Sequence, residues 1–79
     1  RQELWVQFAD KETFFTDEND LKAILTSYPG KNPVVIYCKA ERAVNRLGSS
    51  FMVSDDENLI FDLEKRYGKE NIRIRSLGI

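Results

Sequence analysis

Three segments of the chain alternate in the way expected of β-strands. In ELWVQF at 3–8, three apolar side chains share one face, while Trp5 and Gln7 share the other, which predicts the first strand. The run VVIYC at 34–38 is apolar on both faces and predicts a central strand covered at least partly on both sides. Near the end of the chain, residues 71–75 place isoleucines inward and arginines outward, which predicts the last strand.

Two segments carry the apolar spacing of an amphipathic helix. The first begins near Thr16 to Glu18, after a polar turn at 10–12, and stops at Pro29 and Gly30. The second begins with a capping box in which Ser54 is the N-cap and Glu57 the N3 residue, and ends at Gly68. The two apolar stripes are Leu21, Ile24, Leu25, Tyr28 and Leu59, Ile60, Leu63, Tyr67.

Between these helices, a bend at 39–41 predicts a hairpin that leads into a strand at 42–47, and 51–53 is extended. The resulting order is β-α-β-β-(β)-α-β, where the bracketed strand is short. We therefore expect an α+β fold in which a mainly antiparallel sheet carries two helices on one face. Residues 1–79 form a single compact two-layer domain in this prediction, which suits the length of 79 residues.

The composition excludes several classes of protein and of functional site, but it does not identify the function. Apolar residues make up 42% and charged residues 32% of the chain, which indicates a globular domain. The net charge of −1 gives no overall attraction to nucleic acid, and no apolar run has the length of a membrane span. The chain has one cysteine and no histidine, so an internal disulfide is excluded, and the commonest general base and metal ligand are missing.

Arginines on the predicted strands are the strongest candidates for a partner-binding site. Arg42 and Arg46 lie on the third strand, and Arg73 and Arg75 on the last. If these strands are neighbours, the four side chains form one patch on the open sheet face. Such a patch binds a protein partner or weakly contacts phosphates, or it is a solvated face whose charges discourage edge pairing. The sequence leaves these alternatives open.

The other reactive residue types have structural explanations. The acidic run 55–57 could hold a divalent metal, but acids at a helix N-terminus stabilise free N–H groups and the helix dipole. Cys38 alternates with apolar residues and is expected in the core. We predict no catalytic, cofactor-binding or metal-binding residue in this domain. Trp5 lies opposite the core face of its strand and is the aromatic residue expected to be partly exposed.

Residues 28–75 resemble the C-terminal domain of the bacterial DNA polymerase III alpha subunit, the C-family replicative polymerase. The resemblance weakens before Phe15 and depends on an ordered set of motifs rather than on any single one. These are Gly30-Lys31-Asn32-Pro33-Val34, Tyr37, Arg42-Ala43 to Leu47, Val53-Ser54, Leu59 and Leu63, Gly68, and Ile72-Arg73-Ile74.

The resemblance implies a non-catalytic protein-interaction domain that lies after the polymerase core and an oligonucleotide-binding (OB) domain. It implies attachment to the tau subunit of the clamp loader during DNA replication, in the bacterial cytoplasm. The parent chain would be a DNA-directed DNA polymerase that uses magnesium, with its catalytic aspartates far upstream. Two alternatives remain open: a module that contacts nucleic acid beside the OB domain, and an ACT-like small-molecule regulatory domain. The lack of glycine in the predicted loop 9–16 counts against the second.

Overall fold

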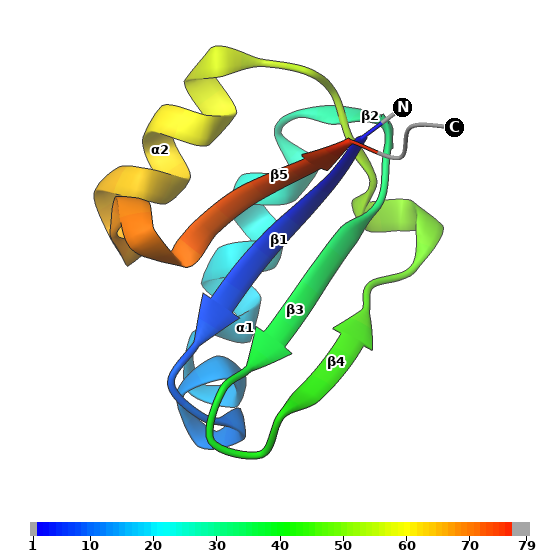
Figure 1. Cartoon of the computed structure of the whole chain (residues 1–79). Helices are drawn as coiled ribbons and strands as arrows, with labels where there is room; N and C mark the ends of the chain where they lie inside the picture. Colours follow the sequence, from blue (N-terminus) through cyan, green and yellow to red (C-terminus); the bar gives the residue numbers. More distant parts are fainter. Residues whose placement is uncertain (1, 77–79) are drawn as a thin grey trace.

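The computed structural model describes residues 2–76, so Arg1 and residues 77–79 of the predicted domain lie outside the described residues. Four strands form one sheet in the order β4-β3-β1-β5, and the helices α1 (Lys11–Thr26) and α2 (Glu57–Tyr67) lie together on one face (Figure 1). The predicted two-layer α+β architecture is therefore confirmed. Within residues 2–76, neither helix has the length and apolar character needed to cross a membrane.

The sheet is mixed because its two central strands are parallel. The strands β1 (Gln2–Phe8) and β3 (Val34–Cys38) run side by side, with Leu4 opposite Val34. The outer pairings, β1 with β5 (Ile72–Ser76) and β3 with β4 (Ala43–Arg46), are antiparallel. The parallel pair follows from the chain path, since α1 carries the chain from the end of β1 back to the start of β3.

The core lies between the sheet and the helices, where the alternating pattern places it. Leu4, Val6 and Phe8 of β1 point into this layer and are buried. They pack with apolar residues of the neighbouring strands and of both helices. The other buried members of the cluster are Phe14, Leu21, Leu25, Val34, Ile36, Cys38, Val53, Leu59, Leu63 and Ile72.

The first helix begins earlier than its sequence signals indicate. The predicted start was Thr16 to Glu18, but α1 begins at Lys11, and Asp10 is its N-cap. The Asp10 side chain accepts a hydrogen bond of 2.7 Å from the Thr13 N–H. The earlier start turns Phe14 toward the sheet, where its ring lies 5.3 Å from that of Phe8. Burial of this ring favours the longer helix.

The second helix begins later than predicted. Asp56, not Ser54, is its N-cap and accepts a hydrogen bond from the Asn58 N–H. The N–H group of Ser54 instead donates to the Tyr28 carbonyl at 2.9 Å. Because the Ser54 N–H group is already bound to Tyr28, it is not available to the Glu57 side chain, and the predicted capping box is replaced by the Asp56 cap. The apolar stripe was predicted correctly, since Leu59 and Leu63 are buried.

The chain segment before α2, around Val53, pairs with a short strand that the sequence pattern did not predict. α1 ends at Thr26, before the predicted stop residues Pro29 and Gly30, and these residues begin the strand β2 (Pro29–Asn32), which forms bridges with Val53. The optional strand expected at 51–53 is therefore reduced to these bridges, and Phe51 ends a 3-10 turn, Ser49–Phe51. Gly30 permits the close approach of these two backbone segments, because a Cβ atom at this position would lie 2.3 Å from the Ser54 nitrogen.

Candidate functional site

The four predicted arginines do not form one patch. The strand order places β4 and β5 at opposite edges of the sheet, with β3 and β1 between them (Figure 1). Arg42 was predicted on the third strand, but β4 begins at Ala43, and Arg42 lies in the turn before it with a left-handed φ of 53°. Of the four arginines, only Arg46, Arg73 and Arg75 lie on strands. They reach the open face, which is the face of the sheet opposite the two helices, from its two edges. A single patch required the third and last strands to be neighbours, and the strand order does not meet this condition. The alternation of side chains along a strand does not specify which strands are adjacent.

A buried glutamate links the two sides of this open face. Glu3, on β1, is only 4% exposed although no helix covers its face. Its carboxylate accepts a hydrogen bond of 2.6 Å from Arg46 Nη1 and one of 3.0 Å from Trp5 Nε1. These two hydrogen bonds, that of Arg46 being the stronger, hold the pKa of the Glu3 carboxyl below its ordinary value.

Trp5 is fixed by one contact within its own strand and one from the neighbouring strand β5. Its indole N–H is bound to Glu3, and the guanidinium carbon of Arg75 lies 5.2 Å from the ring centroid, in a cation–π contact. Val35, which lies opposite Trp5 on β3 and points to the same face, is fully buried. The open face is thus an ordered layer of side chains, held by contacts within the sheet.

A shallow pocket of about 210 Å³ opens beside Trp5 on this face. Aromatic rings of Trp5 and Tyr37 line it from the central strands, and Arg73 and Arg75 line it from β5. Neither of these two arginines forms an ion pair with another residue in the range 2–76, unlike Arg46. The pocket therefore combines apolar surface with two guanidinium groups that are available to an outside carboxylate or phosphate. The remaining lining residues are Gln7, Glu70 and Asn71.

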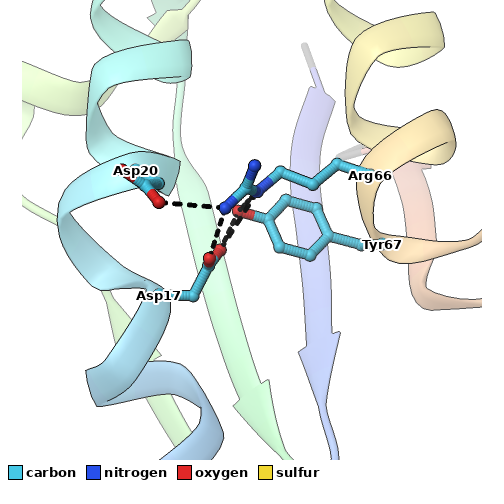
Figure 2. Close-up of polar contacts among 4 residues, drawn as sticks. All are labelled: Asp17, Asp20, Arg66 and Tyr67. Carbon is cyan, nitrogen blue, oxygen red and sulfur yellow. Dashed lines mark hydrogen bonds and ion pairs between the residues drawn. The ribbon is translucent and has the colours of Figure 1, made fainter.

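A second polar cluster joins the two helices. Figure 2 shows Asp17 and Asp20 of α1 pointing toward Arg66 and Tyr67 of α2. Arg66 Nη2 lies 2.6 Å from Asp17 Oδ1 and 3.0 Å from Asp20 Oδ2. The Tyr67 hydroxyl donates a short hydrogen bond to Asp17 and accepts one of 3.2 Å from Arg66 Nε.

The charges in this helix cluster satisfy one another. The Arg66 hydrogen bond holds the pKa of Asp17 below its ordinary value. Burial raises the pKa of the Tyr67 hydroxyl, and the hydrogen bond to Asp17 raises this pKa further. The cluster borders a groove of about 810 Å³ that also includes Thr13 and Asn71. In this cluster Arg66 is already paired with Asp17 and with Asp20. The cluster therefore connects the two helices through ion pairs and hydrogen bonds.

The candidate reactive groups have the surroundings expected of structural residues. Cys38 is buried in the core, as predicted, and burial raises the pKa of its thiol. In the acidic run before α2, Asp56 caps the helix and Asp55 accepts a hydrogen bond of 2.8 Å from Asn32. Across the described residues 2–76, no three His, Cys, Asp or Glu side chains are grouped so that they could hold a metal ion.

Sequence reasoning identified Trp5 and the β5 arginines but missed Glu3, the residue that organises the open face. One signal was present, because Glu3 alternates in phase with Trp5, yet its partner Arg46 is 43 residues away. No protein-family model, curated protein or solved structure matches this chain.

Proposed function

We propose that this domain is a non-catalytic attachment module of the kind found at the C-terminus of the bacterial DNA polymerase III alpha subunit. In this proposal it binds the tau subunit of the clamp loader, at the replisome in the bacterial cytoplasm. The main observation that supports a docking site is the sheet face that no helix covers, on which Trp5 is held in place by Glu3 and Arg75. The partner itself is inferred from the sequence resemblance.

The chemistry of this face favours a protein partner. Tryptophan, tyrosine and arginine are the residue types enriched among binding hot spots, and here Trp5, Tyr37, Arg73 and Arg75 line one pocket. Because Trp5 is already held by a hydrogen bond and a cation–π contact, docking would cost little side-chain entropy. Val44, exposed on β4, extends the apolar part of the face toward the opposite edge.

Contact with single-stranded nucleic acid is the second candidate. The observation in its favour is that Trp5 and Tyr37 lie on adjacent central strands, beside two arginines, as in a base-stacking surface. Two features weigh against it. The Arg75 guanidinium already covers the Trp5 ring, and the Glu3 carboxylate lies beside Trp5 and is paired with Arg46. A phosphate backbone would therefore meet a locally mixed charge.

The test is a calorimetric titration of the domain with the C-terminal part of its own host's tau subunit, at low and at physiological salt. A single-stranded oligonucleotide serves as the parallel titrant. We expect saturable binding of tau that persists at the higher salt. Trp5→Ala should weaken it by roughly thirtyfold or more, which is the loss typical of a hot-spot residue. Phe61→Ala is the matched control, because Phe61 is an exposed aromatic residue on α2, in the helix layer.

The outcomes separate the candidates. Binding of the oligonucleotide alone, collapsing as salt rises, would replace attachment by nucleic-acid contact. Tau binding that Trp5→Ala and Phe61→Ala weaken equally would move the docking site away from the open face. Absence of binding to either titrant would overturn the proposal for this domain. Far-ultraviolet circular dichroism of each variant, with Trp5→Phe as a milder substitution, checks that the fold is retained.

A further inference from the structure

We infer that the free edge of β5 binds an extended segment of a partner protein in which two acidic residues flank one apolar residue. The segment would add a fifth strand to the sheet, beside Arg73 and Arg75. This inference rests on the proposed function as an interaction module. It adds what that proposal lacks, namely the binding mode and the chemical pattern of the partner segment.

The backbone of β5 is available on one side. The strand ends the sheet, and β1 occupies its inner side through the register from Gln2–Ser76 to Val6–Ile72. Residues 73–76 are exposed, and within residues 2–76 their backbone groups form no hydrogen bond outside the ladder with β1. An edge with free N–H and C=O groups is a template for pairing with another strand.

Side chains along this edge alternate in charge and polarity. Arg73 and Arg75 point to the open face, and neither has an ion-pair partner among residues 2–76. Ile74 points to the opposite face and is 42% exposed, which is unusual for an isoleucine that lies in a sheet. The edge therefore presents arginine, isoleucine and arginine in succession, and all three are accessible.

An added strand must match this alternation, because residues directly opposite each other in neighbouring strands point to the same face. Positions i and i+2 of the partner would lie beside Arg73 and Arg75, where carboxylates form charge-assisted hydrogen bonds. Position i+1 would lie beside Ile74, where an apolar side chain covers exposed hydrocarbon. The complementary pattern is thus acidic, apolar, acidic, and it holds for either strand direction.

The other sheet edge lacks this pattern. The strand β4 has four residues, and its arginine, Arg46, is already paired with Glu3 at 2.6 Å. Its exposed apolar residue, Val44, points to the open face rather than away from it. A strand added to β4 would therefore find no unpaired guanidinium on that strand. The charge pattern selects β5 as the docking edge.

The probe is a synthetic peptide with blocked ends and the sequence Ser-Thr-Glu-Val-Glu-Thr-Ser, titrated into the ¹⁵N-labelled domain and followed by NMR. We expect saturable shifts of the backbone amides of β5 and of the Trp5 indole, and slower hydrogen exchange in β5. The double variant Arg73→Glu, Arg75→Glu should bind about tenfold more weakly, from the loss of two cross-strand charge pairs. A peptide with lysines in place of both glutamates should recover binding to that variant, which shows that the variant is folded.

Two controls test the pattern itself. A peptide of the same composition with adjacent glutamates, Ser-Thr-Glu-Glu-Val-Thr-Ser, should bind several-fold more weakly, because only one carboxylate can then face an arginine. Arg42→Glu makes one such charge reversal, in the turn before β4, and should leave the affinity unchanged, whereas Arg73→Glu alone should weaken binding several-fold. Equal affinity for the two peptides, shifts centred on β4 or α2, or no shift at millimolar peptide would each overturn the inference.

Failure of this inference can be told apart from failure of the proposed function. If the tau fragment binds but β5 amides do not shift and the peptide does not compete, the strand-addition mode is wrong and the attachment function stands. If the peptide binds β5 while the tau fragment does not bind, the docking edge stands and the proposed partner is wrong.

Discussion

Two adjacent phenylalanines provide a direct test of where α1 begins. Phe14 is 2% exposed and packs on Phe8, whereas Phe15 is 62% exposed. In a helix that starts at Lys11, only one of these neighbours can face the sheet. If the chain were instead a loop up to Thr16, the two side chains would have no reason to differ so strongly. We therefore expect very unequal effects from Phe14→Ala and Phe15→Ala.

The magnitudes follow from burial. Removal of a buried phenylalanine side chain costs about 3–5 kcal/mol, because the transfer free energy of the ring is lost and a cavity remains. A domain of 79 residues has a total stability of about 4–12 kcal/mol. Phe14→Ala therefore removes a large part of it. Phe15→Ala should change the stability by no more than about 0.5 kcal/mol, since it alters an exposed position and alanine has the better helix propensity.

Urea unfolding, followed by circular dichroism at 222 nm and by Trp5 fluorescence, measures both variants. With a slope near 1 kcal/mol per molar urea, a loss of about 3–5 kcal/mol means that Phe14→Ala should lower the midpoint by about 3–5 M or leave the domain unfolded. Phe14→Leu keeps most of the buried volume and gives a measurable intermediate if alanine abolishes folding. Equal losses for Phe14→Ala and Phe15→Ala would refute both the early helix start and the packing on Phe8.

Other consequences concern pH and the glycine that ends α2. Because the pKa values of the Glu3 and Asp17 carboxyls are lowered in the folded domain, their stabilising effect is complete above the ordinary carboxyl pKa values of about 4 and is lost progressively as the pH falls below them. Urea midpoints between pH 7 and 3 should show this decline, and Asp17→Asn should make it shallower; an unchanged slope would contradict the Asp17–Arg66 pairing. Gly68 has a φ of 93°, so Gly68→Ala should cost at least about 1 kcal/mol. Gly48→Ala, at a φ of −69° with open space around it, should be nearly neutral by the same measurement.

Local pattern was sufficient for the faces of the elements. The alternation in β1 correctly placed Leu4, Val6 and Phe8 in the core and left Trp5 on the other face. The helical stripe around Leu59 and Leu63 was equally reliable. These predictions hold because side-chain direction repeats every 2 residues in a strand and every 3.6 in a helix, whatever the rest of the fold does.

Helix starts were less predictable, because several residues near each start can act as a cap. Asp10 and Thr16 are both acceptable N-caps by residue type. The sheet decides between them, since the Asp10 start buries Phe14 against Phe8. For α2, the hydrogen bond from Ser54 to Tyr28 removed the expected cap. Tertiary contacts outweigh local capping here because burial of a large side chain contributes more than one capping bond.

The candidate site depended most on the tertiary structure. The sequence alone determined that Arg46, Arg73 and Arg75 lie on strands and that Trp5 shares the face opposite the core. Only the strand order β4-β3-β1-β5 determined that these arginines come from opposite edges and that Glu3 lies between them. Side-chain alternation is a property of one strand, whereas strand order arises from the chain path through both helices and the packing of the whole core.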